Sequence, residues 1–260
     1  MGPRPWKAAR IPQEYVDDTQ YAGRMPEPEP GAAEDPRAEA LRSVRAPAYE
    51  NPRQEVQAHV PVEARRILDL GCSSGALGAA LKARAGDDTT VVGAEADPGY
   101  AELARPRLDD VVEGDLADPG TVARLEALGP FDCLIAADVL EHLVDPWSAL
   151  RSYAELLEPG ATAVVSLPNV RHWETLWQLG VRGVWPRRAS GIFDRDHLRW
   201  FTAADAIGLL QGAGLQLAAI DRVVRVRRDP SGWDRLARPL LRTPLRPFVT
   251  FQLILTGRRA

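Results

Sequence analysis

A short apolar segment runs directly into a turn of small residues in RRILDLGCSSGALG, residues 65–78. Its first half predicts a buried strand, because three of its first six residues are Ile or Leu. Gly71 and Gly75 let the backbone of the turn approach a ligand closely. The alanine- and leucine-rich residues 76–84 predict a helix, whose first N–H groups would face the same ligand. This strand–turn–helix unit predicts both the fold and a binding site at its turn.

The alternation of apolar strands and helices continues along the chain. Three Asp-Pro pairs, at 97–98, 118–119 and 145–146, predict helix starts, because aspartate caps free N–H groups and proline suits the first helical position. Further strands are expected at 89–95, 110–113, 131–137, 161–167, 215–226 and 248–256. Apolar strands separated by helices are typical of a parallel sheet covered on both faces. We therefore expect one doubly wound α/β domain.

The composition is that of an ordinary globular chain, with 260 residues, 45% apolar and 26% charged. Two cysteines cannot support a disulfide framework, so a small secreted scaffold is excluded and a reducing compartment is favoured. No apolar segment approaches the about 20 residues that cross a bilayer, and the first residues contain no apolar signal core. These features predict a cytoplasmic protein without a membrane partner.

Charge is distributed unevenly along the chain. Residues 1–220 carry 22 basic and 33 acidic groups, a balance of −11, whereas residues 221–260 carry 10 arginines and 3 aspartates, a balance of +7. A duplex-binding protein usually concentrates basic residues across its domain. Because the bulk of this chain is acidic, nucleic acid is disfavoured as the main partner, and the basic end is predicted to be a rim or partner surface.

Residues 1–45 differ from the rest of the chain. Prolines alternate there with acids and alanines, and such a segment cannot bury enough apolar surface to offset its ordering entropy. We predict a flexible proline-rich arm at 1–45 and a folded domain at 46–260. Within the domain, residues 168–200 are predicted to form a substrate lid and residues 227–247 a basic insertion. The arm and the basic C-terminal region are the candidate sites for a protein partner.

Acidic residues follow the next two predicted strands. Glu95 closes the second strand, where a carboxylate can accept hydrogen bonds from both ribose hydroxyls of a nucleoside. Asp115 follows the third strand and could receive the exocyclic amine of an adenine, with Leu116 as an apolar wall. Ligands of open parallel sheets bind beyond the carboxyl ends of the strands. Each signal alone is weak, but their register on successive strands favours a nucleoside-containing ligand.

These motifs resemble those of class I S-adenosylmethionine-dependent methyltransferases. ILDLGCSSG (67–75) is similar to the first motif of that family, Glu95 to its ribose-binding acid, and GDL (114–116) to its adenine-contacting pair. DVLEHL (138–143) is similar to the sequence after the fourth strand, and LEPGA (157–161) to the turn before the fifth. The resemblance implies a Rossmann-like seven-stranded sheet, mostly parallel with the last strand antiparallel, and S-adenosylmethionine as cofactor. It implies cofactor binding by Asp69, Gly71, Ser73, Gly75, Glu95, Ala96, Asp115, Leu116 and Asp138.

One position departs from the family pattern. The usual turn is G-x-G-x-G, and its central glycine is Ser73 here. A serine fits this turn without strain if its φ is negative, whereas a strained backbone would weaken cofactor binding. The same serine argues against a nicotinamide dehydrogenase, because Gly71, Ser73 and Gly78 do not reproduce the G-x-G-x-x-G fingerprint.

Two of the four histidines are predicted to lie in the active site. His197 is the first candidate for a general base or for positioning the acceptor, and His142 is the second. Either histidine could instead hydrogen-bond its own loop. A metal bound by Asp138, Glu141 and His142 is a minority alternative, and we expect none, because adjacent charged residues are more often solvated.

The predicted lid is too long for a plain strand–helix connection and is rich in tryptophan. Trp173, Trp177 and Trp200 are expected to enclose an organic substrate together with Asn169, although packing of the lid alone would also explain them. The string DRDHLRWFT (194–202) resembles a bacterial subgroup of small-molecule methyltransferases whose acceptors vary widely.

We therefore predict a methyltransferase acting on oxygen or nitrogen of a small organic acceptor, such as a sugar or secondary metabolite. Tyr49, Asn51 and Arg53 are expected to cover the cofactor. The sequence AAD at 136–138 lacks the Asn/Asp-Pro-Pro-Tyr/Phe motif of enzymes that methylate nucleic-acid bases. Two alternatives stay open: a non-catalytic partner or scaffold that keeps the fold, and a protein or ribosomal RNA methyltransferase that uses the basic C-terminal stretch.

Overall fold

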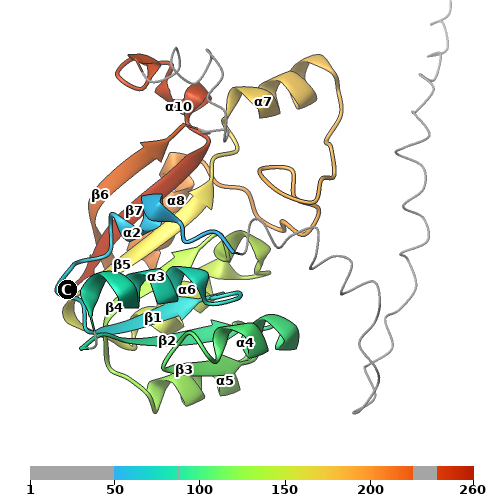
Figure 1. Ribbon diagram of the computed structural model, residues 1–260. Coiled ribbons are helices and arrows are strands. Elements are labelled where there is room, and N and C mark those ends of the chain that lie inside the picture. The colour runs from blue at the N-terminus through green and yellow to red at the C-terminus, as the bar shows by residue number, and fades with distance from the viewer. Residues whose placement is uncertain (1–49, 87, 225–238) are drawn as a thin grey trace, which may run out of the picture. The chain divides into compact units, whose positions relative to one another are not determined.

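The computed structural model describes residues 50–86, 88–224 and 239–260. The predicted arm at 1–45 lies outside these ranges, as do Tyr49 and the first part of the predicted basic insertion. The described residues form a seven-stranded sheet with helices packed on both faces (Figure 1). The predicted doubly wound α/β fold is confirmed.

The sheet is parallel except at its last strand. The strands are β1 (Arg66–Leu70), β2 (Thr90–Glu95), β3 (Asp110–Glu113), β4 (Phe131–Ala137), β5 (Leu157–Pro168), β6 (Leu215–Val223) and β7 (Gln252–Arg259). Their order is β3-β2-β1-β4-β5-β7-β6. β7 lies between β5 and β6 and is antiparallel to both, as predicted for the last strand. The order reverses beside β1, so the carboxyl ends of β1 and β4 are the expected site of ligand binding.

Helices connect the strands and begin where the local sequence predicts. They are α2 (Gln54–Gln57), α3 (Ala76–Ala85), α4 (Pro98–Ala104), α5 (Pro119–Glu126), η3 (Leu140–His142), α6 (Pro146–Ala154), α7 (Trp173–Thr175), η4 (Leu176–Val181), α8 (Ala203–Gly212) and α10 (Arg246–Val249). Asp97, Asp118 and Asp145 accept hydrogen bonds from N–H groups of α4, α5 and α6, each with proline next in the chain. Thr202 and Asp205 form the capping box of α8. Within the described ranges, no helix is long and apolar enough to cross a bilayer.

Several strand boundaries differ from the prediction by one to four residues. β7 begins at Gln252 rather than at 248, because Phe248 belongs to α10, whose Pro247 suits the first helical turn. β5 begins at Leu157 rather than at 161, because Leu157 already pairs with Phe131 of β4. The register then shifts between Phe131 and Cys133. β6 ends at 223, and the last two residues predicted for it lie outside the described ranges.

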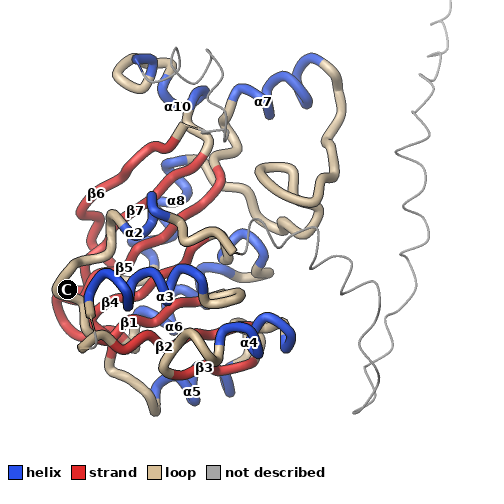
Figure 2. Tube along the Cα trace, viewed as in Figure 1, coloured by secondary structure: helices blue, strands red, loops and turns tan. Residues whose placement is uncertain are grey.

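Alternate residues of the central strands enter two apolar clusters, one on each face of the sheet. Leu68 and Leu134 join the cluster formed with α5, α6 and α8, whereas Ile67 and Ile135 join the cluster formed with α2 and α3. Figure 2 shows the helices running beside the strands that they cover. Because both faces are packed, the residues that follow β1 and β4 are held together at the carboxyl ends of these two strands.

Tyr153 links the α6 layer to the loop after β3. Its side chain is fully buried, and its hydroxyl donates a 2.9 Å hydrogen bond to the Leu116 carbonyl. We predict that Tyr153→Phe lowers the free energy of unfolding by about 1–2 kcal/mol, because the buried carbonyl loses its partner. Urea denaturation measures this, with an unchanged m-value showing that the folded state is kept. A variant as stable as the wild type would show that this bond contributes nothing.

Candidate active site

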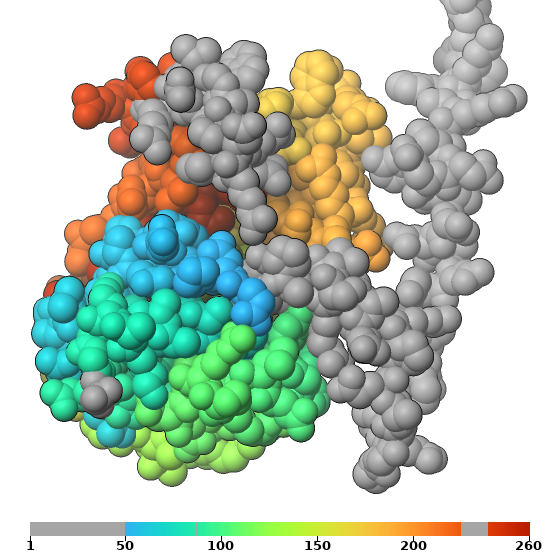
Figure 3. All heavy atoms as spheres, viewed as in Figure 1, coloured from blue at the N-terminus to red at the C-terminus, as the bar shows by residue number. Residues whose placement is uncertain are grey.

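A cavity of about 720 Å³ lies at the carboxyl ends of β1 and β4. Its wall also includes the end of β5, the start of β7 and part of the predicted lid. In the space-filling view, the segment that follows residue 50 lies between the surfaces of α3 and of β6 and β7 (Figure 3). Six of the sequence-predicted site residues line this cavity: Asp69, Gly71, Ser73, Asp138, His142 and His197.

The turn after β1 has left-handed backbone at three positions. Gly71, Ser73 and Gly75 have φ values of +65°, +50° and +78°. A Cβ at position 71 would lie 2.6 Å from Cγ2 of Val139, so only glycine allows this approach. The positive φ of Ser73 means that this serine has a strained backbone. Its buried hydroxyl has no hydrogen-bond partner among the described residues.

Glu95, at the end of β2, holds this turn in place. Its carboxylate accepts hydrogen bonds from the N–H groups of Ser73 (2.8 Å) and Asp97 (2.9 Å). Burial raises the pKa of Glu95 above its usual value. A carboxylate accepts about four hydrogen bonds, so capacity remains for two ribose hydroxyls. Ala96, beside it, is exposed.

The predicted adenine-binding residues lie after β3, outside the cavity lining. Asp115 is exposed and accepts a 2.8 Å hydrogen bond from the Ala117 N–H group. Leu116 is buried, and its carbonyl accepts the hydrogen bond from Tyr153. These contacts organise the loop, and the roles of Asp115 and Leu116 toward adenine stay predictions.

Asp69 is a buried carboxyl group at the floor of the cavity. It is 2% exposed, and its Oδ2 atom has no hydrogen-bond partner in the part of the chain that the structure describes. Burial, together with the nearby Glu95, raises the pKa of Asp69 to about 7, although Arg53 acts in the opposite direction. The oxygen is free to meet a polar group of a ligand that enters the turn.

Asp138, the first residue after β4, is held by a network that crosses the cavity. Its backbone is left-handed, with φ +57°, and its Oδ2 lies 2.5 Å from Nη1 of Arg53. The other carboxylate oxygen accepts hydrogen bonds from Ser166 (3.4 Å) and from Gln252. Arg53 and Asn51 line the cavity, and the predicted covering of the cofactor by this segment stays a prediction. Sequence reasoning missed Ser166 and Gln252, because no motif marks them and only the pairing of β5 with β7 brings them here.

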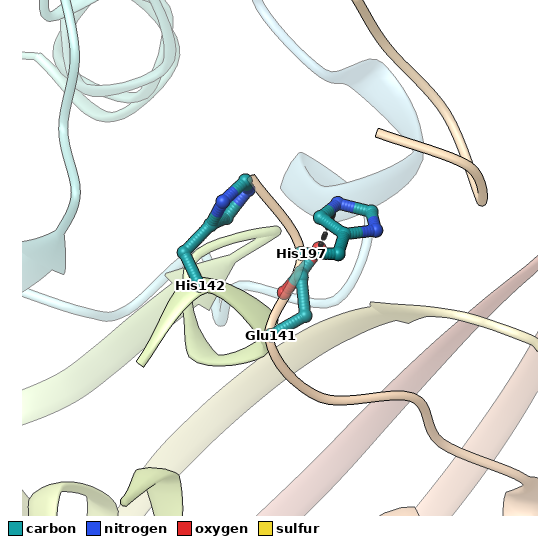
Figure 4. Close-up of side chains that lie close together, drawn as sticks. All are labelled: Glu141, His142 and His197. Atoms are coloured by element: carbon teal, nitrogen blue, oxygen red, sulfur yellow. Dashed lines mark ion pairs between the residues drawn. The ribbon is translucent and has the colours of Figure 1, made fainter. Parts of the chain in front are cut away.

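The two predicted catalytic histidines lie together beside Glu141 (Figure 4). The ring centroids of His142 and His197 are 4.7 Å apart, and Nε2 of His197 lies 3.8 Å from Oε1 of Glu141. Nδ1 of His142 faces the Asp196 carbonyl at 3.1 Å, and Nδ1 of His197 faces the Ile192 carbonyl at 3.4 Å. Because a carbonyl only accepts, each Nδ1 carries the proton and each Nε2 keeps its lone pair.

Glu141 connects the loop after β4 to the segment that carries His197. Its carbonyl accepts hydrogen bonds from the N–H groups of Leu198 (2.9 Å) and Arg199 (3.0 Å). Burial and the nearby Asp138 raise the pKa of Glu141 well above its usual value. The backbone of this residue thus fixes the distance between its own carboxyl group and His197.

Asn169 has a clear local role at the base of the predicted lid. It is buried, and its Nδ2 donates to the carbonyls of Pro247 (2.7 Å) and Thr250 (2.8 Å). Its Oδ1 accepts a 3.2 Å hydrogen bond from the Arg171 N–H group. Asn169 is not among the residues that line the cavity, and its role toward substrate stays a prediction.

The three tryptophans predicted to bind substrate are about half exposed. Trp173, Trp177 and Trp200 are 56%, 50% and 44% exposed, and none is among the residues that line the described cavity. Trp200 packs edge-on against Trp185, which in turn packs against Phe193. Packing within the segment therefore accounts for part of its aromatic content, and contact with substrate stays a prediction.

Comparison with known proteins identifies the family. The sequence model described as Methyltransferase domain matches residues 29–220, which is most of the chain. The chain belongs to this methyltransferase family. The methyltransferase is 32% identical over 184 residues to the ubiquinone biosynthesis O-methyltransferase of Cereibacter sphaeroides, covering 70% of this chain and 71% of that protein.

Solved structures share the fold of this methyltransferase. A SAM dependent methyltransferase from Archaeoglobus fulgidus is similar with a TM-score of 0.57 and 13% identity, covering 86% of this chain and 100% of that one. Magnesium protoporphyrin IX methyltransferase from Synechocystis PCC 6803, solved with bound SAH, is similar with a TM-score of 0.54 and 17% identity, covering 88% and 90%. At these identities the similarity concerns the fold.

S-adenosylmethionine is the cofactor of this methyltransferase. The turn after β1 fits such a ligand in two respects: the unpartnered oxygens of Asp69 and Ser73 among the described residues, and the remaining hydrogen-bonding capacity of Glu95. The contact of Gly71, Ser73 and Gly75 with the cofactor stays a prediction.

Asp69 makes the stability of the methyltransferase depend on pH. Its folded-state pKa of about 7 lies above the value of about 3.9 in an unfolded chain, so the folded state keeps a proton that the unfolded state releases. The contribution of Asp69 to stability is therefore complete below about pH 4 and is lost as the pH rises to 7. Replacement by asparagine removes this loss.

We predict that the free energy of unfolding of Asp69→Asn, relative to wild type, increases by on the order of 4 kcal/mol between pH 4 and pH 8. Urea denaturation of both proteins at each pH, without cofactor, gives this double difference. Titration of other groups cancels in the comparison. A difference that stays constant or decreases with pH would contradict the raised pKa of Asp69.

Proposed function

We propose that this methyltransferase transfers the methyl group of its cofactor to a hydroxyl oxygen of a small organic acceptor. The observation that carries this proposal is the single cavity shared by the turn after β1 and the histidines His142 and His197. The relatives named ubiquinone biosynthesis O-methyltransferase also support transfer to oxygen. A hydroxyl acceptor must lose its proton during transfer, so polar groups beside the cofactor are required.

The charge of the cavity suits the cofactor. When bound, S-adenosylmethionine supplies a methyl group on a positively charged sulfur. Apart from the two histidines, the acidic and basic residues that line the cavity are Arg53 and the five acids Glu55, Asp69, Asp138, Glu141 and Asp194. This excess of carboxyl groups favours a sulfonium, and we expect Asp138 to lie near the methionine part of the cofactor.

Both histidine rings face a backbone carbonyl with Nδ1 and so leave Nε2 for a ligand. Burial and proximity to His142 lower the pKa of His197, so its imidazole is uncharged near pH 7. The Nε2 lone pair that each ring retains can receive the acceptor hydroxyl. His197 is the first candidate for this role and His142 the second, and each acts by holding the hydroxyl oxygen in line with the transferred methyl group.

We further propose a cytoplasmic location, supported by the two cysteines, Cys72 and Cys133, which are both buried and unpaired. A protein partner at residues 1–45 or at the basic C-terminal region stays a prediction.

Two substitutions separate cofactor binding from turnover. We predict that Glu95→Ala weakens S-adenosylhomocysteine binding at least 10-fold, because hydrogen bonds to a charged group are worth about 1.5–3 kcal/mol. His197→Ala should leave that affinity within twofold and lower turnover by about 10²–10⁴. Calorimetric titration measures the first effect, and release of S-adenosylhomocysteine across a panel of hydroxylated acceptors measures the second.

His59→Ala is the matched control, because His59 lies outside the cavity lining and pairs with Asp221. The opposite pattern, with Glu95 affecting turnover alone and His197 affecting binding, would overturn the division of roles. A wild-type protein that does not bind S-adenosylhomocysteine at millimolar concentration would instead support a non-catalytic scaffold. Salt-dependent retention on ribosomal RNA would support an RNA acceptor.

A further inference from the structure

Glu141 is a buried carboxyl group that lacks hydrogen bonds. It is 0% exposed, and neither Oε1 nor Oε2 has a hydrogen-bond partner within the described residues. A buried carboxyl group without hydrogen bonds is unfavourable, because buried polar groups are normally hydrogen-bonded or coordinate metals. The structure therefore leaves room at Glu141 for a cation.

The two imidazoles beside Glu141 are oriented as metal ligands are. A ligating histidine almost always donates its other ring N–H group to a carbonyl or carboxylate, which directs the lone pair of the remaining nitrogen. His142 and His197 both have this arrangement, with Nδ1 on the carbonyls of Asp196 and Ile192. Such orientation of two neighbouring rings is unnecessary for simple packing.

The distances are compatible with one ion. One ligand atom from each of Glu141, His142 and His197 lies within 4.8 Å of the other two. With metal–ligand distances of about 2.0–2.2 Å, three ligands around one ion lie about 3.3–3.8 Å from one another. The 3.8 Å separation of Glu141 Oε1 and His197 Nε2 is at the upper end of that range, and a separation of 4.8 Å requires a closure of about 1 Å.

We propose that Glu141, His142 and His197 bind a divalent cation, and that the acceptor hydroxyl oxygen occupies one of its open coordination positions. Two imidazoles and one carboxylate form a ligand set of catalytic zinc sites, which keep a position for water or substrate. The set also suits other first-row divalent metals. This inference differs from the expectation of no metal, and it replaces direct contact between the histidines and the hydroxyl by contact through the cation. It rests on the proposed function for the identity of the acceptor.

The cation would assist the same methyl transfer by making the acceptor hydroxyl group more acidic. Coordination lowers the pKa of a bound hydroxyl group, whose proton leaves to water. The resulting oxygen forms the new bond to the methyl carbon as the sulfur–carbon bond breaks. S-adenosylhomocysteine is then the leaving group, and the electron pair of the broken bond remains on its sulfur.

The first test uses the untagged wild-type chain, freed of metal with EDTA and titrated with ZnCl₂. We expect one site per chain by calorimetry. In NMR spectra, the ring signals of His142 and His197 should move with the first equivalent, whereas those of His59 and His172 should stay. Absence of binding, or movement of the His59 and His172 signals alone, would overturn the proposal.

The second test uses variants. His142→Ala, His197→Ala and Glu141→Gln should each weaken Zn²⁺ binding at least 10-fold, and His59→Ala should bind as the wild type does. Binding of S-adenosylhomocysteine by each variant shows that it is folded. Variants that fold and keep the wild-type affinity for Zn²⁺ would overturn the assignment of ligands.

The outcomes for the cation and for the proposed function are distinct. Zn²⁺ binding at these residues without methyl transfer to any hydroxylated acceptor would refute the proposed function and leave the cation site standing. Full turnover by a metal-free chain that binds no Zn²⁺ would refute the cation site and leave the histidines to act on the hydroxyl directly.

Discussion

The close approach of the Gly71 backbone to the Val139 side chain is the constraint on which the site depends. It brings the turn after β1 against the loop after β4, with no room for a Cβ between them. Both loops then face one cavity, which the cofactor turn and the histidines share. A larger residue at 71 would separate the two loops and move the cofactor turn away from the histidines.

From this contact the organisation of the site extends outward through Glu141. Its carbonyl holds the segment at Leu198 and Arg199, and its carboxyl group faces His197. The loop after β4 therefore holds the part of the predicted lid that carries His197 close to His142. The half-exposed Trp173 and Trp177 lie on another part of that segment, in α7 and η4.

Local features were predictable from the sequence, and features that depend on strand register were not. The Asp97 cap and the turn at Gly71 follow from neighbouring residues, so their patterns predict them directly. The backbone of Ser73 could not be assigned, because a serine is compatible with either sign of φ. Contacts across more than 50 residues, such as Glu141 with His197 or Gln252 with Asp138, require the folded sheet.

The position of β7 between β5 and β6 has a consequence for the order of assembly. β6 precedes β7 in the chain but pairs only with it, so this side of the sheet must wait until residues 252–259 have been synthesised. Such long-range pairing is slow, because the chain loses conformational entropy on loop closure before the new contacts stabilise the sheet. Since Gln252 also bonds Asp138, this part of the cavity wall forms only after the last strand has been synthesised. A chain interrupted before β7 would keep the cofactor turn but would lack a finished active site.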